Sequence, residues 1–227
     1  MTQVSDPPVQ YSRPLAYAQL MRIPNVFTAI ADVLMGFFVT HMLPLPWVPM
    51  AVLAAASACL YLAGMVLNDV FDVEQDAVER PNRPIPSGRS SIGAARMLGL
   101  ELLVVGCALG WLGSYLGGSP RAGIVATALA ALVFAYDRIL KRTPAGPLAM
   151  GGCRFLNVLL GMSLAPTEWH EVHWMIAAGI GVYIVGVTWF ARSEAASPSR
   201  TQLTGGLIVM AAGLGLLLWF PSWIDHE

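Results

Sequence analysis

Charged side chains are scarce in this sequence. Only 12% of its 227 residues are Asp, Glu, Lys or Arg, whereas 56% are hydrophobic. Soluble domains carry about 25% charged residues, so the chain holds about half the usual supply. Its net charge of −1 also argues against a nucleic-acid-binding protein. The composition therefore predicts a membrane protein.

Cysteine is rare as well. The three cysteines, Cys59, Cys107 and Cys153, stand in apolar stretches, and no two have the spacing of a zinc site. We interpret them as small buried hydrophobic residues, which argues against a disulfide-stabilised or zinc-centred fold. A cleavable signal peptide is not expected, because the first 25 residues are polar and contain proline.

Long apolar stretches are what the sequence does have. Seven of them approach the roughly 17–25 residues that cross a bilayer as a helix. They lie near residues 26–43, 47–67, 92–112, 122–140, 147–165, 172–190 and 203–220. Because they are continuous rather than alternating, helices are favoured over a barrel. The sequence thus predicts an all-α, polytopic transmembrane helix bundle, with residues 1–227 forming a single domain.

The basic residues predict the orientation of this bundle. Eleven of the 13 lie on one side of it, while Arg121 lies opposite and Arg154 falls inside a span. Lys and Arg accumulate in cytoplasmic loops. We therefore expect a multi-pass protein of the inner (plasma) membrane, with a cytoplasmic N-terminus and its polar chemistry on the cytoplasmic side.

The densest polar stretch follows the second apolar segment. If the helix continues to about Arg80, a rotation of 100° per residue places Asn68, Asp72 and Asp76 at about 0°, 40° and 80°, with Asp69 at about 100°. Carboxylates grouped so closely repel one another unless a cation lies among them. Mg²⁺ suits the group, because it binds one or two carboxylates together with substrate phosphates. The alternative is a solvated acidic loop.

Arginines accompany the acidic residues. Pro81 disfavours a helical conformation at Arg80 and ends the helix. Pro84 and Pro86 are then expected to keep the chain extended, so that Arg83 folds back toward the carboxylates. Guanidinium groups match phosphate oxygens. The segment therefore predicts a magnesium and diphosphate site at the end of a membrane span.

These residues carry a family resemblance. The pattern from Asn68 through Asp69, Asp72 and Asp76, continued by Arg80-x-x-Arg83-Pro-Ile-Pro-Ser-Gly, resembles the first signature of the UbiA superfamily of intramembrane prenyltransferases. The short element Arg22-Ile-Pro-Asn25 is similar to one that this family has before its first span. The phrases 136–144 and 152–157 are similar to the UbiA-like branch of Ebo-type bacterial gene clusters.

The resemblance implies a helical bundle around a central cavity, Mg²⁺, a prenyl diphosphate donor and an aromatic or lipid-soluble acceptor. The expected metal ligands are Asn68, Asp69, Asp72 and Asp76. The aspartates and Lys141 are the expected catalytic residues. The expected substrate-binding residues are Arg22, Asn25, Asn68, Arg80, Arg83, Tyr136, Arg154, Asn157 and Glu194.

The chain also departs from the family pattern. A second aspartate motif is usual after the sixth span, but here that loop has Glu194 as its only carboxylate. Glu194 is either a replacement ligand or a solvated loop residue. The family norm is nine spans, whereas seven are predicted here.

A charge inside a span needs a partner or a cavity. Insertion of such a charge costs about 2.5–3.5 kcal/mol. Arg154 shares a helix face with Asn157, so both are expected to face the diphosphate cavity. The alternative is a structural pairing of Arg154 with another helix.

The predicted function is Mg²⁺-dependent transfer of a prenyl group from its diphosphate to an acceptor in the membrane. The alternative is a non-catalytic isoprenoid-binding or carrier protein derived from the same family. The missing second aspartate motif and the low number of spans motivate that alternative.

Overall fold

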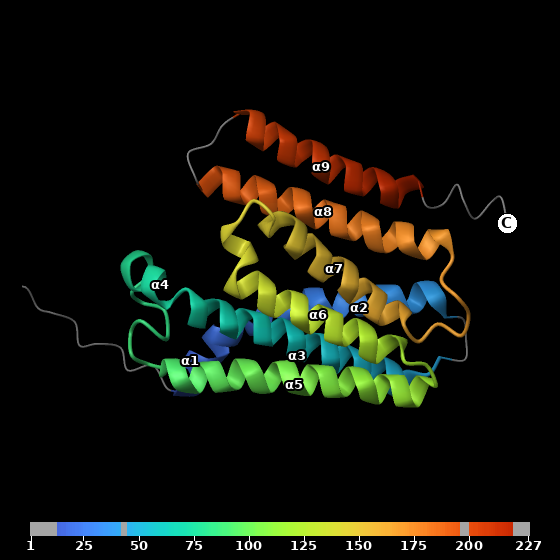
Figure 1. Cartoon of the computed structure of the whole chain (residues 1–227), viewed down its shortest axis with the longest axis horizontal. Helices are drawn as coiled ribbons and strands as arrows, with labels where there is room; N and C mark the ends of the chain where they lie inside the picture. The colour runs from blue at the N-terminus through green and yellow to red at the C-terminus, as the bar shows by residue number, and fades with distance from the viewer. Residues whose placement is uncertain (1–12, 42–44, 196–199, 220–227) are drawn as a thin grey trace, which may run out of the picture.

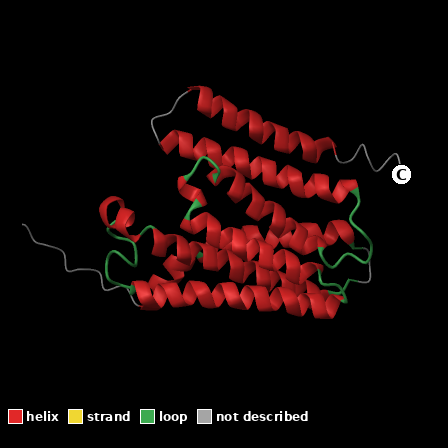
Figure 2. Cartoon of the chain, viewed as in Figure 1, coloured by secondary structure: helices red, strands yellow, loops and turns green. Residues whose placement is uncertain are grey.

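Helices alone make up the regular structure of the described residues. The computed structural model describes residues 13–41, 45–195 and 200–219, and within these ranges it contains no strand, as predicted (Figure 2). The long helices are α2 (Val26–Thr40), α3 (Trp47–Phe71), α5 (Ile92–Gly117), α6 (Arg121–Arg138), α7 (Gly146–Met162), α8 (Glu171–Ala195) and α9 (Arg200–Trp219). The short helices are α1 (Arg13–Met21), η1 (Ile23–Asn25), α4 (Val73–Glu79) and η2 (Leu140–Arg142).

Each of the seven long helices overlaps one predicted apolar segment, and the helices run side by side (Figure 1). Five segments of the described chain are long and apolar enough to cross a membrane, namely Pro14–Thr40, Trp47–Phe71, Ile92–Gly117, Glu171–Arg192 and Arg200–Trp219. Helices α6 and α7 have 18 and 17 residues. The number of spans and the orientation of the N-terminus stay predictions.

Helix α3 occupies the centre of the bundle. It packs against α1, α2, α5, α6 and α7, while α9 packs on α8 at the outside (Figure 1). Its buried side chains include Leu53, Leu60 and Leu67, which belong to the main hydrophobic core. The helix carries its carboxyl end, with the acidic residues, to one end of the bundle, where α4 and the loop to α5 follow.

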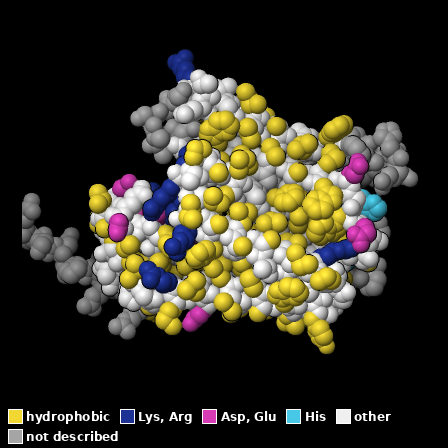
Figure 3. All heavy atoms as spheres, viewed as in Figure 1, with side chains coloured by type: hydrophobic (Ala, Val, Ile, Leu, Met, Phe, Trp, Pro, Cys, Tyr) yellow, Lys and Arg dark blue, Asp and Glu magenta, His cyan; other side chains and the backbone are white. Residues whose placement is uncertain are grey.

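The surface separates apolar and charged residues. Figure 3 shows hydrophobic side chains across the middle of the visible face and most of its charged side chains toward the two ends. Large apolar residues are exposed on several helices, among them Val104 on α5 and Leu218 on α9. A soluble protein would expose few such residues in a contiguous area, so this surface suits a lipid environment.

Candidate active site

The acidic segment departs from the predicted uninterrupted helix. Helix α3 ends at Phe71 and α4 begins at Val73, with Asp72 between them at φ −100° and ψ 10°. The hydrogen-bond pattern nevertheless continues, because the Asp72 amide donates to Asn68 O (3.0 Å) and the Asp76 amide donates to Asp72 O (2.8 Å). The prediction of one regular helix was therefore wrong at Asp72.

Arg83 connects two of the aspartates. Its Nη1 atom lies 3.0 Å from Asp69 Oδ1 and 2.6 Å from Asp76 Oδ2. Arg83 folds back, as predicted, although the segment behind it is not extended. It forms turns, in which the Ser87 amide donates to Arg83 O and the Gly88 amide donates to Ile85 O, both at 3.0 Å.

Arg22 reaches the same carboxylate from the other side. Its Nη2 atom donates to Asp69 Oδ1 at 2.9 Å. The Arg22 backbone has φ 46° and ψ 47°, a left-handed conformation that residues other than glycine rarely adopt. Such a conformation costs of order 1–2 kcal/mol and lies here at the junction of α1 and η1. The strained turn coincides with a residue that contacts Asp69, a pattern common at functional sites.

Asp72 is neutralised separately. Lys141 Nζ lies 2.7 Å from Asp72 Oδ2, and Arg142 Nη2 lies 3.1 Å from Asp72 Oδ1. Both cations come from η2, which follows α6. Sequence reasoning selected Lys141 but missed Arg142, although the two are adjacent. Arg142 also donates to Phe71 O at 3.0 Å, which fixes it at the break between α3 and α4.

The basic and acidic side chains that pair at this end are unequal in number. Five basic side chains contact three aspartates, an imbalance that favours an anionic ligand. The basic residues are Arg22, Arg80, Arg83, Lys141 and Arg142. Within the described ranges, no group of three or more Asp, Glu, His or Cys side chains is arranged to hold a metal ion, because the aspartates face these cations. We define the three aspartates and five basic residues as the charged cluster.

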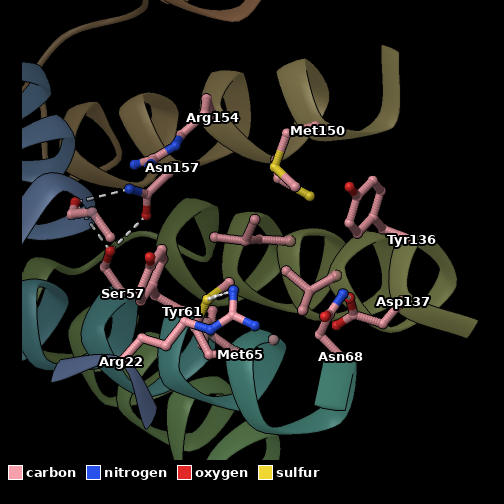
Figure 4. Close-up of a pocket in the computed structure, with 16 residues that line it drawn as sticks. Arg22, Ser57, Tyr61, Met65, Asn68, Tyr136, Asp137, Met150, Arg154 and Asn157 are labelled. Carbon is pink, nitrogen blue, oxygen red and sulfur yellow. Dashed lines mark hydrogen bonds between the residues drawn. The ribbon is translucent and has the colours of Figure 1, made fainter. Parts of the chain in front are cut away.

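A cavity of about 220 Å³ lies inside the bundle beside the charged cluster, and Arg22 is the member of the cluster that lines it (Figure 4). Ser57 and Asn68 of α3 both line it, and at 1.5 Å per residue they lie about 16 Å apart along the helix. One wall is largely apolar and consists of Leu60, Leu129, Val133, Met150 and Cys153. A cavity that has an apolar wall and adjoins the charged cluster at Arg22 suits an amphipathic ligand with an anionic head.

The deeper part of the cavity contains a polar network. Arg154 lines the cavity, and its Nη1 atom also lies 2.8 Å from Asp32 Oδ2 of α2. The predicted position at the cavity and the alternative, a pairing with another helix, are therefore both present. Asn157 Nδ2 donates to Ala29 O at 2.8 Å, and Ser57 Oγ donates to Asn157 Oδ1 at 2.7 Å. These bonds connect α2, α3 and α7.

Asp137 lines the cavity beside Asn68. The Asn68 amide donates to Asp137 Oδ1 at 3.2 Å, and Figure 4 shows the two side chains pointing toward each other. Asp137 is only 3% exposed. This residue was missed from the sequence because it stands near the end of an apolar segment, where a loop carboxylate is equally plausible.

The remaining predicted residues differ in position. Tyr136 lines the cavity. Arg80 Nη1 lies 3.8 Å from Asp76 Oδ1 with a largely exposed side chain. Asn25 is exposed at the end of η1 and does not line the cavity. Glu194 belongs to the end of α8, and its side chain lies outside the described residues.

The fold and the site define a helical membrane protein with a charged cluster beside an internal cavity. Comparison with known families identifies it further, because the model of the UbiA prenyltransferase family matches residues 29–200, well over half of the sequence. The chain belongs to this family, as the resemblance of its acidic segment predicted.

Individual relatives agree with this assignment. Digeranylgeranylglyceryl phosphate synthase of Ignicoccus hospitalis is 37% identical over 155 residues, which cover 68% of this chain and 48% of that protein. The synthase of the same name from Saccharolobus solfataricus is 39% identical over 41% of this chain and 33% of its own length. The synthase from Sulfurisphaera tokodaii is 29% identical over 92% of this chain and 73% of its own length. The chain thus spans half or less of the first two relatives.

A solved structure shares the fold. It comes from a study of digeranylgeranylglyceryl phosphate synthase in membranes and superimposes with a TM-score of 0.75, covering 94% of this chain and 78% of that one. At 19% sequence identity, this likeness supports the arrangement of the helices alone.

Proposed function

We propose that this protein is a prenyltransferase that moves a prenyl group from a prenyl diphosphate to an aromatic or lipid-soluble acceptor in the membrane. The observation that carries the proposal is the charged cluster beside a largely apolar cavity, which Arg22 lines while it contacts Asp69. A prenyl diphosphate has the matching shape, with an anionic head and a hydrocarbon chain. Family membership and the names of the relatives support the same reaction class.

The basic residues supply the diphosphate site. Arg22, Arg83 and Lys141 converge from three different segments of the chain on the carboxylates at the end of α3. On donor binding, these side chains contact the diphosphate oxygens and stabilise the charge that grows as the allylic C–O bond breaks. The acceptor then attacks the allylic carbon and loses a proton, and inorganic diphosphate leaves. The surrounding helices exclude water, which prevents hydrolysis of the donor.

The aspartates suit Mg²⁺. Asp69, Asp72 and Asp76 offer oxygen ligands of the kind that this ion prefers. Arg83 Nη1 already lies within 3.0 Å of oxygens from Asp69 and Asp76, so one small cation can face both. When bound, Mg²⁺ would neutralise the diphosphate and make it a better leaving group. The Asn68 amide is instead directed at Asp137, so we give Asn68 a supporting place beside the metal.

The site is proposed to face the cytoplasm from the inner (plasma) membrane. All five basic residues of the charged cluster lie in loops or short helices at the same end as α4. Cytoplasmic loops collect such residues, which favours the cytoplasmic side for the site.

Turnover in membranes tests the proposal. The protein in lipid nanodiscs receives Mg²⁺, labelled farnesyl or geranylgeranyl diphosphate, and a panel of phenolic and glyceryl lipid acceptors. The wild-type protein is expected to release diphosphate and form a labelled product, and Asp72→Asn to lose at least about a hundredfold in rate, as for other removed charge-stabilising groups. Tight donor binding without diphosphate release for any acceptor would favour the carrier hypothesis. Wild-type turnover by Asp72→Asn would rule out the role of Asp72.

A further inference from the structure

One buried oxygen in the cavity wall has no hydrogen-bond partner. Among the described residues, only two buried side-chain polar atoms are unpaired, namely Asp137 Oδ2 and Ser90 Oγ. Of these two residues only Asp137 lines the cavity. Buried polar groups are nearly always hydrogen-bonded, since leaving one unpaired costs about 1–3 kcal/mol. An unpaired carboxyl oxygen in a cavity wall therefore calls for a hydrogen-bond donor from a ligand.

The surroundings of Asp137 leave room for such a donor. Its other oxygen, Oδ1, already accepts from the Asn68 amide at 3.2 Å, which holds the carboxyl group in place. Gly64 of α3 also lines the cavity, and a Cβ atom at this position would lie 3.7 Å from Oδ2. Because glycine has no side chain, a small group can approach Oδ2 from the side of the cavity.

Asp137 is also adjacent to the proposed diphosphate site. Lys141 Nζ lies 2.7 Å from Asp72 Oδ2 and 3.5 Å from the backbone oxygen of Asn68, the residue whose side chain contacts Asp137. A group bound to Asp137 is therefore held between the charged cluster and the apolar cavity, where the head of the donor meets its prenyl chain.

We infer that Asp137 recognises the acceptor by accepting a hydrogen bond from its hydroxyl group through Oδ2. This inference rests on the proposed function and adds a chemical class, because it selects acceptors that carry an alcohol or phenol hydroxyl over acceptors that lack a hydrogen-bond donor. Asn68 is the positioning residue, since its amide fixes the carboxyl group.

Asp137→Asn gives the most direct test. The carbonyl oxygen of the new amide can accept from Asn68 as before, which leaves an NH₂ group in place of Oδ2. A hydrogen-bond acceptor in the cavity thus becomes a donor, while size and packing stay nearly constant. The preference for a hydroxyl over its methyl ether is expected to disappear, because both compounds can accept from the NH₂ group.

Binding is measured without turnover. Nanodiscs containing the protein are first loaded with geranylgeranyl thiolodiphosphate, an unreactive donor analogue, and Mg²⁺. A long-chain phenol and a monoalkylglycerol are then compared with their methyl ethers. We expect wild-type protein to bind the hydroxyl compound at least about tenfold more tightly than the ether, as hydrogen bonds to charged groups allow. In Asp137→Asn the ratio is expected to fall below about threefold, with an unchanged dissociation constant for the donor analogue.

Two further variants complete the test. Arg138→Gln changes an exposed side chain at the same end of α6 and is expected to keep the wild-type preference. Gly64→Ala places a methyl group beside Oδ2 and is expected to lower the preference even if Asp137→Asn does not fold. An unchanged preference in Gly64→Ala and in any folded Asp137→Asn would overturn the inference. If the wild-type protein binds the thiolodiphosphate but shows no preference for the hydroxyl compound, only the inference about Asp137 is contradicted. If the wild-type protein does not bind the thiolodiphosphate, the proposed function is contradicted as well.

Discussion

At the scale of single residues, Arg83 has the most informative position in the charged cluster. One of its nitrogen atoms contacts both Asp69 and Asp76, which are 4% and 2% exposed. Carboxylates buried to this degree are costly without a cation beside them. Arg83 therefore stabilises the ligand-free arrangement, and in the proposed reaction it also supplies a contact to the diphosphate.

Substitution of Arg83 tests both parts of this role. Arg83→Gln keeps hydrogen-bond donors but removes the charge, so the affinity for geranylgeranyl thiolodiphosphate is expected to fall about tenfold or more, as for other charged hydrogen bonds. Equilibrium binding in nanodiscs measures the change. Arg96→Gln is the matched control, because Arg96 is exposed on α5 and lies outside the charged cluster. Equal losses in both variants would show a general charge effect rather than a local contact.

Residue positions were predictable where a pattern pointed to them. The spacing of Asp69, Asp72 and Asp76 indicated a charged site, and the position of Arg154 inside an apolar segment indicated a need for a partner. Asp32 also stands inside an apolar segment, residues 26–43, and it pairs with Arg154. The need of such a charge for a partner could therefore have identified Asp32 from the sequence. Asp137 gave a weaker signal, because it stands near the end of residues 122–140, and its unpaired oxygen becomes visible only when α3 and α6 are packed together.

At the scale of helices, the long continuous apolar stretches of the sequence predicted the positions of α2, α3 and α5–α9 well. Two local features were not predictable from it. The break at Asp72 coincides with contacts from η2, including the hydrogen bond from Arg142 to Phe71 O. The turns after Arg83 form where prolines suggested an extended chain, since proline fixes its own φ but leaves the following residues free to turn.

Close helix packing gives a prediction at this scale. Gly161 of α7 faces α2, and a Cβ atom there would lie 2.0 Å from Val33 O. Because backbone blocks the added atom, Gly161→Ala must separate the two helices that carry Arg154 and Asp32. We expect a loss of about 1–3 kcal/mol in unfolding free energy, measured by thermal unfolding in detergent.

Gly215 provides the control for this substitution. A Cβ atom at Gly215 of α9 meets no heavy atom within 4 Å, so Gly215→Ala is expected to leave stability unchanged or slightly raised, since alanine favours a helix. Equal melting temperatures for the Gly161→Ala and wild-type proteins would contradict the close contact between α2 and α7.

At the scale of the whole molecule, charge distribution and bundle geometry agree. The charged cluster lies at the end of the bundle where α4 and η2 are found. At the opposite end in Figure 1, Arg121 at the start of α6 pairs with Glu168, which lies in the connection between α7 and α8. Composition and the long continuous apolar stretches were sufficient to predict the helical membrane bundle. It could not predict the cavity, which depends on how side chains from α3, α6 and α7 pack.

Labelling of single cysteines tests the predicted orientation. In a background where Cys59, Cys107 and Cys153 are replaced by alanine, Glu79→Cys and Glu168→Cys place one thiol at each end, at exposed positions. A membrane-impermeant maleimide is expected to label Glu168→Cys in spheroplasts, and Glu79→Cys only after the membrane is opened. The reverse pattern would place the charged cluster outside the cell.

The most direct test of the central claim is the release of inorganic diphosphate from geranylgeranyl diphosphate in nanodiscs, in the presence of Mg²⁺ and an acceptor that the wild-type protein uses. We predict that Asp69→Asn and Asp76→Asn each reduce the rate at least about a hundredfold, while Arg96→Gln keeps it. Release by either aspartate variant at the wild-type rate would contradict the claim that the charged cluster binds the diphosphate and promotes its departure.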